Sequence, residues 1–328
     1  MAKKKKVAII STGGTIAGAG KPGQSGIYKA GLISIDEIIQ SVPEVKDIAD
    51  LEVYNVCSKD SNDITWEDIL KIKETAERLE NDPTIDGMVI THGTDTMEET
   101  AFALNLILDV HKPVVITGAM RPATATSADG PMNLMQAISL ACSPHTKEMG
   151  VLALISDTIY SGRDLTKVNS IKTDAFETAD PGPIGYMQDE NAYLLHQPYR
   201  RHTFYSRFAK DTPINLPRTA IYYVHSQDDP ELLDYMLDRY DGVVIAGSGS
   251  GNYSTKIKEV IENHADDCMV IRSSRLLEGA AFESPVFDPK GVTIPAHRLS
   301  PHKARILLSL GLAHQLSKKE LAQLYKEY

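Results

Sequence analysis

The sequence has little cysteine and no long hydrophobic run. Its three cysteines, Cys57, Cys142 and Cys268, are far apart and form no CxxC pair, which argues against a disulfide framework and against a zinc site. We expect all three to be buried as small hydrophobic residues. No apolar run approaches the roughly 18 residues that a membrane-spanning helix needs. The sequence therefore predicts a protein that is stabilised by an ordinary hydrophobic core and does not enter a membrane.

Positive charge is also scarce. The chain has 34 basic and 44 acidic residues, a formal net charge of −10, so long-range attraction to nucleic acid or to an anionic membrane is disfavoured. The basic cluster at 3–6 precedes only the short apolar stretch 7–10, whereas the apolar segment of a signal peptide takes about 7–15 residues. We therefore expect a cytoplasmic protein, although an exported protein trimmed of its leader would have the same sequence.

Hydrophobic periodicity predicts two α/β domains. Strands that alternate with helices are typical of βαβ units and a parallel sheet. We expect an N-terminal catalytic domain over 1–197, in which helices flank a mainly parallel sheet, a linker over 198–217, and a smaller α/β domain over 218–328. The predicted strands lie near 7–10, 51–57, 86–91, 113–118, 151–156, 220–225, 242–246 and 269–271. The predicted helices lie near 34–42, 65–80, 95–108, 129–141, 231–239, 256–264, 302–312 and 318–326.

Two threonine-rich segments follow predicted strands directly. They are residues 12–18 (TGGTIAG) and residues 91–100 (THGTDTMEET). In an open α/β sheet such strand ends converge on the ligand crevice, so we expect both segments to face one pocket. A threonine hydroxyl can act as a nucleophile when a neighbouring group removes its proton, and glycines let backbone N–H groups approach a developing oxyanion.

Other chemistries lack their signatures. Thr15 stands where a dinucleotide-binding GxGxxG needs glycine, and Ala19 stands where a P-loop needs lysine. No serine lies in a GxSxG elbow, and there is no HExxH motif and no Cys/His cluster. We therefore expect chemistry without a metal or cofactor.

Three polar residues in and near the second segment each allow two interpretations. Asp95 is either a binding group for a cation or, with Glu98, the cap of the helix that follows. His92 is either a general base or a structural residue of the turn. Lys167, in the segment 162–167, is either a proton acceptor or an ordinary solvated lysine.

Taken together, these segments resemble a known family. Residues 12–18 and 91–100 are similar to the two signature motifs of the bacterial L-asparaginases, and most of all to the type II branch. The likeness continues through 118–122, 127–131, 162–167, 271–275 and 303–305, so it covers nearly the whole chain. It implies hydrolysis of L-asparagine to L-aspartate and ammonia without a cofactor, with L-glutamine hydrolysis as a minor activity. It also implies a homotetramer of intimate dimers.

The resemblance implies a role for each matching residue. Thr15 would be the nucleophile that forms an acyl-enzyme, and Tyr28, on a mobile loop, would help to move its proton. Thr94 and Lys167 would form a second proton-handling pair, with Thr94 either positioning the attacking water or sharing the oxyanion. Asp95 would bind the ammonium group of the substrate.

Further residues would complete the substrate pocket. Ser58 would hold the α-carboxylate, beside Lys59 and Ala119. Lys59 departs from the family pattern, because type II enzymes usually carry Gln or Glu there. A cation at this position would either strengthen carboxylate binding or perturb the ammonium site, which leaves the preference between asparagine and glutamine open.

The resemblance also implies that a neighbouring subunit contributes to each site. Ser250 replaces an Asn found in some members of the family, and both Glu283 and Asp288 are candidates for the carboxylate that the neighbour supplies. The cysteine pair that bridges some exported members is missing, which favours a cytoplasmic protein.

Two alternatives to an independent amidohydrolase stay open. A non-catalytic sensor would use Asp95 and Ser58 to bind an amino acid without turnover. An amidase subunit of a tRNA-dependent amidotransferase shares these motifs, and an assay without any partner separates it.

Overall fold

The computed structural model describes residues 4–21, 23–24, 28–29 and 35–328. Two units, Met1–Asp211 and Thr212–Tyr328, each have their own internal packing. The fold is α/β in both units, as the sequence predicts.

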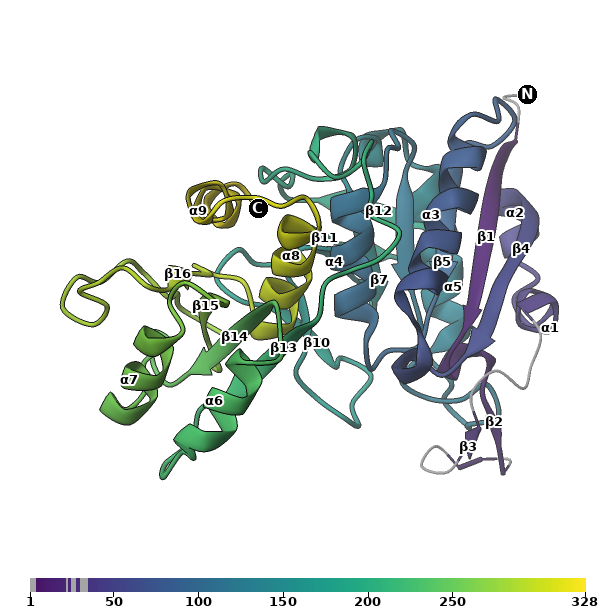
Figure 1. Ribbon diagram of the computed structural model, residues 1–328. Coiled ribbons are helices and arrows are strands. Elements are labelled where there is room, and N and C mark those ends of the chain that lie inside the picture. The colour runs from purple at the N-terminus through teal and green to yellow at the C-terminus, as the bar shows by residue number, and fades with distance from the viewer. Residues whose placement is uncertain (1–3, 22, 25–27, 30–34) are drawn as a thin grey trace. The chain divides into compact units, whose positions relative to one another are not determined.

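The N-terminal unit contains, within the described residues, one eight-stranded sheet in the order β12-β11-β8-β7-β6-β5-β1-β4 (Figure 1). Its parallel strands are β4 (Ala49–Lys59), β1 (Lys5–Gly13), β5 (Gly87–Thr91), β6 (Val114–Thr117) and β7 (Val151–Ile155). The remaining strands, each antiparallel to its neighbour, are β8 (Thr158–Ser161), β11 (Gly185–Gln188) and β12 (Asn191–Leu194). The prediction of a mainly parallel sheet is confirmed, and the antiparallel edge is an addition to it.

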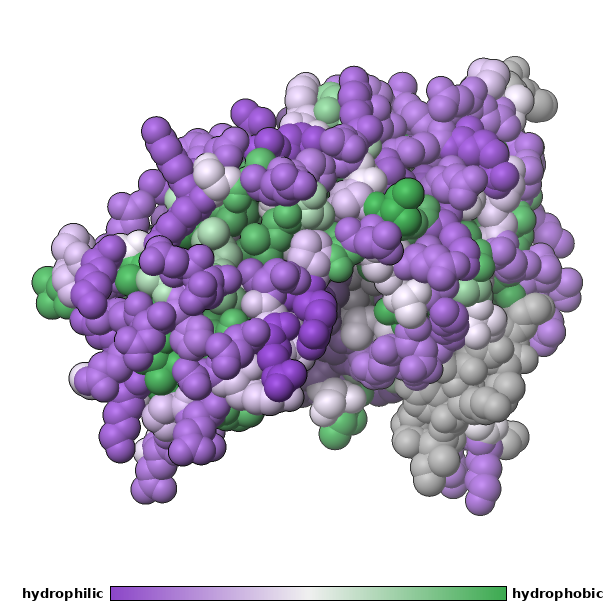
Figure 2. All heavy atoms as spheres, viewed as in Figure 1, coloured by the Kyte–Doolittle hydropathy of each residue, from purple (hydrophilic) through white to green (hydrophobic). Residues whose placement is uncertain are grey.

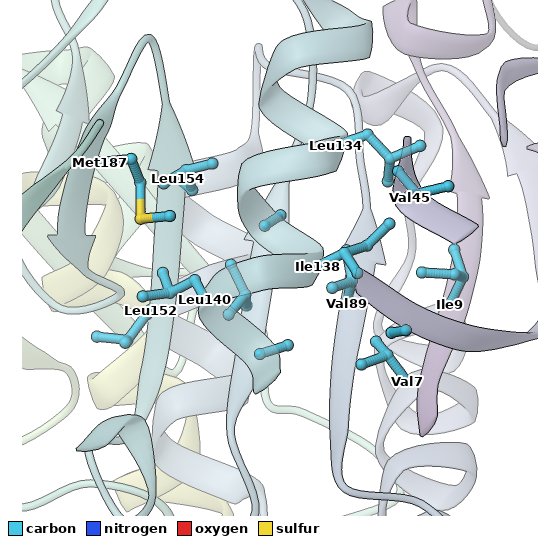
Figure 3. Close-up of a cluster of buried hydrophobic side chains, with 14 of the residues drawn as sticks. Val7, Ile9, Val45, Val89, Leu134, Ile138, Leu140, Leu152, Leu154 and Met187 are labelled. Carbon is cyan, nitrogen blue, oxygen red and sulfur yellow. The ribbon is translucent and has the colours of Figure 1, made fainter. Parts of the chain in front are cut away.

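Two layers of helices cover this sheet because both faces of its central strands are apolar. Val7, Ile9 and Val89 pack in one cluster with Leu134 and Ile138 of α5 (Figure 3). Side chains alternate along a strand, so Ala8, Ile10, Met88 and Ile90 point to the opposite face, where they too are fully buried. The helices of this unit are α1 (Ile35–Gln40), α2 (Val45–Ile48), α3 (Trp66–Glu80), α4 (Met97–Ile107) and α5 (Gly130–Cys142).

Short elements connect these helices and strands. The 3₁₀ turns are η1 (Thr15–Ala17), η2 (Ser61–Asp63), η3 (Pro144–Thr146) and η4 (Thr203–Tyr205). Two small antiparallel pairs join β2 (Ala19–Gly20) to β3 (Tyr28–Lys29) and β9 (Leu165–Lys167) to β10 (Phe176–Thr178). The turn η4 lies inside the predicted linker, where Phe204 stacks on His111 with ring centroids 3.9 Å apart. Lys73 Nζ donates to the Ala209 carbonyl in the same segment.

The C-terminal unit is a smaller parallel sheet between helices. Its strands, in spatial order, are β13 (Thr219–Tyr223), β14 (Gly242–Gly247), β15 (Met269–Ser274) and β16 (Ile294–Pro295). Its helices are α6 (Pro230–Leu237), α7 (Thr255–Asn263), α8 (Pro301–Ala313) and α9 (Lys318–Glu327). Leu233 of α6 and Ile257 of α7 pack with Val243 and Ile245 of β14. Gly242 lets Leu308 of α8 lie close to β14.

The visible face of the molecule is largely polar. Figure 2 shows hydrophilic residues over most of the visible face, with hydrophobic residues in separate groups. None of the helices in the described ranges combines the length and the apolar character needed to cross a bilayer. The three cysteines are free, and Cys268 is buried as predicted, whereas Cys57 and Cys142 are only partly buried.

Candidate active site

Four strand ends meet at one edge of the N-terminal sheet. The register pairs Ser11 with Thr91 and Thr91 with Thr117, and it pairs Gly13 with Lys59. Because these strands are parallel, their carboxyl ends lie at one edge of the sheet, together with the turns that follow β1, β5 and β6. In Figure 1 this edge is at the end of β1 that lies away from the N-terminus. Both threonine-rich segments leave the sheet there.

The two threonine segments touch through their glycines. A methyl group added at Gly14 would lie 2.3 Å from the nitrogen and 2.6 Å from the Cα of Gly93. One added at Gly118, after β6, would lie 2.4 Å from the His92 carbonyl oxygen and 3.3 Å from Thr94 Cγ2. Only glycine permits such backbone approach, so the turns after β1, β5 and β6 form one continuous wall.

The two threonines of the first segment have different surroundings. The Thr12 hydroxyl donates to the Thr91 carbonyl at 2.8 Å, and Thr12 is 1% exposed. Thr12 therefore joins β1 to β5. Thr15 follows the glycine pair Gly13 and Gly14, whose φ values of 105° and 86° turn the chain out of the strand. Thr15 lies in the 3₁₀ turn η1 and is 6% exposed.

Lys167 connects to the second segment through two contacts. Its Nζ lies 2.9 Å from Thr94 Oγ1 and 2.5 Å from Asp95 Oδ1. An ammonium group has donors only, so Thr94 Oγ1 accepts from Lys167 and keeps its own proton for another acceptor. The Thr94 hydroxyl is thus available as a donor.

Asp95 is an ionised acceptor and is not a helix cap. The hydrogen bond from Lys167 lowers the pKa of Asp95, partial burial opposes this, and Asn62 Nδ2 at 3.4 Å from Oδ2 adds to the lowering. Its side chain is 57% exposed, so a cationic ligand can reach it. The interpretation of Asp95 and Glu98 as a cap is wrong, because α4 has Thr96 at its N-cap without a side-chain cap bond.

His92 is buried within the wall. It is fully buried, and its Nδ1 lies 2.7 Å from the Gly93 carbonyl oxygen. A carbonyl only accepts, so Nδ1 carries the proton. Burial lowers the pKa of His92 to about 4, against a smaller opposing effect of this hydrogen bond. The ring is therefore neutral at neutral pH and only weakly basic, and its complete burial favours the structural interpretation.

The end of β4 carries Ser58, which is exposed, and Lys59. Lys59 Nζ lies 2.6 Å from Asp68 Oδ2 on α3. Burial alone would raise the pKa of Asp68, but Lys59 and the backbone and hydroxyl of Thr65 lower it to about 2. The ammonium of Lys59 is thus paired with a buried carboxylate of its own chain.

Within the residues described, no group of three or more His, Cys, Asp and Glu side chains is placed to hold a metal ion. The polar groups that gather at this edge include threonine hydroxyls, the exposed Asp95 carboxylate and the Lys167 ammonium.

Two family models match most of the chain. Residues 6–200 match the family model "Asparaginase, N-terminal", and residues 218–325 match "Glutaminase/Asparaginase C-terminal domain". The chain belongs to the asparaginase family. It is accordingly an enzyme of this family, as the resemblance of its motifs predicts.

Individual asparaginases are similar along nearly their full length. A probable periplasmic L-asparaginase of Haemophilus influenzae is 37% identical over 328 residues, which cover 98% of this chain and 93% of that protein. A glutaminase-asparaginase of Pseudomonas fluorescens biotype A is 37% identical over 333 residues, which cover 99% of this chain and 91% of that protein. The crystal structure of a probable cytoplasmic L-asparaginase from Campylobacter jejuni superposes with a TM-score of 0.94 at 37% identity, covering 99% of this chain and 100% of that one.

Most site residues expected from the asparaginase motifs lie at the shared edge. Thr94, Asp95 and Lys167 contact one another, Thr15 follows the turn that touches Gly93, and Ala119 is buried beside that wall after β6. The backbone of Tyr28 pairs with β2, but its side chain lies outside what the structure describes. The roles assigned to these asparaginase residues stay predictions.

The residues predicted to serve a neighbouring asparaginase subunit lie in the C-terminal unit. Ser250 is exposed, and its carbonyl accepts from Arg272. Glu283 Oε1 accepts from Lys326 at 2.9 Å, and Asp288 accepts from the backbone of Val292 and Thr293. Each carboxylate thus has a partner in its own unit, and neither is singled out by these contacts.

Sequence reasoning missed several supporting residues of the site. Asp129 accepts from the backbone N–H groups of Met120 and Arg121, both at 2.9 Å, and so shapes the turn after β6. Thr96 Oγ1 donates to the Ser61 carbonyl at 2.7 Å and joins α4 to η2. The Asp129 bonds span eight and nine residues and the Thr96 bond spans 35, and no local pattern signals them.

Proposed function

We propose that this enzyme hydrolyses L-asparagine to L-aspartate and ammonia through an acyl-enzyme on Thr15, with L-glutamine hydrolysis as a minor activity. The contact between the Gly14 turn and the Gly93 turn, beside the Lys167–Thr94–Asp95 cluster, carries the proposal. Relatives called L-asparaginase and glutaminase-asparaginase, each 37% identical, support the substrate.

Charge and hydrogen bonding would hold the substrate. The Asp95 carboxylate is ionised and accessible, so it suits the α-ammonium, where a charge-assisted hydrogen bond contributes about 1.5–3 kcal/mol. Ser58 would donate to the α-carboxylate. Lys59 lies next to it, and Ala119 would line the wall beside the amide. This arrangement points the side-chain amide toward the turn that carries Thr15.

In the first step, the Thr15 hydroxyl oxygen would attack the amide carbon. Tyr28 is proposed to help move the proton of Thr15, which ends on the departing nitrogen. Backbone N–H groups of the glycine turns would stabilise the oxyanion, and each such donor typically lowers the barrier by about 2.7–4 kcal/mol. When the C–N bond breaks, ammonia leaves and an ester on Thr15 remains.

In the second step, water would attack this ester. Thr94 would position the water or share the oxyanion, and Lys167 would handle the proton that the water loses. The ester C–O bond breaks, Thr15 regains its proton, and L-aspartate is released. The balance needs water alone as the second substrate, so no cofactor enters.

The decisive experiment compares Thr15→Ala with Thr15→Ser. We expect the alanine variant to lose ammonia release from L-asparagine by more than about 10³-fold, because the nucleophile is gone. The serine variant keeps a hydroxyl and should keep measurable turnover. An acyl adduct on Thr15, trapped with a slow substrate and seen by mass spectrometry, would identify the intermediate. Retained turnover in a folded Thr15→Ala variant would reject Thr15 as the nucleophile.

Binding without chemistry is a separable outcome. If calorimetry shows that the wild type binds L-aspartate while no amide is turned over, the protein is a sensor and the proposal fails. Because the assay contains the purified chain alone, dependence on an added partner would identify an amidotransferase subunit instead.

We infer in addition that the enzyme assembles as a homotetramer of intimate dimers and works in the cytoplasm. The full-length similarity to asparaginases supports the assembly, with Ser250 and either Glu283 or Asp288 serving the neighbour. A relative from Campylobacter jejuni is called cytoplasmic, whereas that from Haemophilus influenzae is called periplasmic. Light scattering of the purified protein and fractionation of producing cells test the two statements, and a monomer or an exported protein would contradict them.

A further inference from the structure

Lys59 supports the turn that carries Thr15 with its backbone. Its carbonyl oxygen accepts a hydrogen bond from Gly14 N at 3.1 Å. A methyl group added at Gly13 would lie 2.6 Å from that same oxygen and 2.7 Å from Lys59 N. The Gly13–Gly14 turn therefore rests directly on the last residue of β4.

The side chain of Lys59 extends from the same residue to the start of α3. Its Nζ lies 2.6 Å from Asp68 Oδ2, and the Asp68 side chain is 4% exposed. The same carboxylate oxygen accepts from Thr65 N at 2.9 Å and from Thr65 Oγ1 at 2.7 Å, as part of the capping box of α3. Lys59 is thus bonded at its backbone to the Thr15 turn and at its ammonium to a capped helix end.

We propose that Lys59 is a positioning residue, whose ion pair with Asp68 fixes the carbonyl that holds Gly14 and so fixes the placement of Thr15. The inference rests on the proposed function, in which Thr15 is the nucleophile. It assigns Lys59 a role different from the direct substrate contact expected from its sequence position. The start of α3, with its full capping box, is a rigid anchor. The end of β1 is less regular, because its pairing with β4 shifts register between Ser11 and Gly13.

The contacts of Lys59 also distinguish this positioning role from a direct role in substrate selection. The Lys59 ammonium is bonded to a carboxylate that is itself almost fully buried, so its charge is compensated within the chain. Loss of the tether should impair attack on any amide alike, because it displaces the nucleophile. Loss of a substrate contact should instead change KM and the ratio between asparagine and glutamine.

The test compares Lys59→Met with Lys59→Arg and with Asp68→Asn. We expect Lys59→Met to lower kcat about tenfold for both amides with KM nearly unchanged, since a small displacement of a reacting group is costly. Arginine keeps the ion pair and should restore most of the turnover. Asp68→Asn keeps an acceptor for Thr65 but lacks the charge, so it should reproduce the loss. The double variant Lys59→Met with Asp68→Asn should be little worse than either single one.

Lys71→Met is the matched control. Lys71 also forms an ion pair, with Glu67 at 2.7 Å, but both side chains are exposed and both lie on α3 itself. Its variant should match the wild type in kcat. Melting temperatures and circular dichroism establish that all variants are folded before rates are compared.

Hydrogen exchange makes the inference testable apart from the activity. Amides of residues 12–18 should exchange faster in Lys59→Met than in the wild type and in Lys71→Met. If the wild type hydrolyses neither amide, the proposed function fails, and exchange still decides whether the tether exists. Unchanged kcat and unchanged exchange in Lys59→Met would overturn the inference. A selective change in KM or in the ratio of the two substrates would overturn it as well, in favour of direct substrate contact.

Discussion

Replacing Gly14 by alanine should separate the two threonine turns. Gly14 has φ 86° and ψ −174°, a region that is essentially restricted to glycine. The new methyl group would lie 2.3 Å from Gly93 N and 2.6 Å from Gly93 Cα. Both of these atoms are backbone, so no flexible side chain can move aside. The overlap can be relieved only by moving one turn away from the other.

The expected cost has two parts. Forcing a residue with a side chain into this backbone region costs about 1–3 kcal/mol. Overpacking against a fixed neighbour costs about another 1–3 kcal/mol. A total of about 2–6 kcal/mol is a large part of the roughly 5–15 kcal/mol that stabilises a typical domain. We therefore expect the turns to shift apart and the melting temperature to fall.

Activity should fall more steeply than stability. A shift of about 1 Å between reacting groups costs on the order of 10²-fold in rate. Gly182→Ala is the control, because Gly182 also has a positive φ, 74°, but a methyl group there meets no atom within 4 Å. The Gly182→Ala variant reports the effect of a side chain at positive φ without the steric overlap. Ammonia release and thermal unfolding are measured for both variants. A Gly14→Ala protein as stable and as active as Gly182→Ala would refute the contact between the turns.

Two other predictions follow from the charges at the same edge. Asp95→Asn should raise KM for L-asparagine by about 10- to 100-fold, the equivalent of one charge-assisted hydrogen bond. Steady-state kinetics of this variant, compared with those of Asn62→Ala, measure the change. An unchanged KM in Asp95→Asn would exclude Asp95 as the ammonium site. Folding lowers the pKa of Asp68 from 3.8 to about 2. The contribution of Asp68 to the free energy of unfolding is therefore complete above the pKa of the unfolded chain, and it is lost as pH falls through the pKa of the folded protein. The contribution is on the order of 2 kcal/mol. The difference in melting temperature between wild type and Asp68→Asn should therefore shrink as pH is lowered from about 4 to about 2. A constant difference would contradict the ionised, stabilising state of Asp68.

The elements that the sequence predicts well are those with a strong local signal. The helix predicted over 65–80 has apolar residues at helical spacing, and α3 spans Trp66–Glu80 with Ile72, Ala76 and Leu79 buried. The strands β1, β5 and β7 are continuous apolar runs and are fully buried for most of their length. The antiparallel edge escaped prediction because β11 and β12 are short, and β12 has only exposed and partly buried residues, a pattern shared with polar loops.

The site was predictable to the extent that topology determines it. Parallel strands share one carboxyl edge, so two segments that follow such strands were expected to meet, and they do. The different surroundings of Thr12 and Thr15 were not predictable from residue type. They depend on the hydrogen bond from Thr12 to the Thr91 carbonyl, 79 residues away. The partner of Asp95 was equally hidden, since Lys167 lies 72 residues further along the chain.

The contacts of Lys167 bear on the order of events in the proposed reaction. In the described arrangement Lys167 donates to both Thr94 and Asp95, and a donor with its proton in place cannot accept one from water. A substrate ammonium bound at Asp95 would compete for the same carboxylate and weaken its hold on Lys167, because two cations would then share one anion. Substrate binding would thereby loosen the contact between Lys167 and Asp95 and leave Lys167 beside Thr94 for the step in which water attacks the ester.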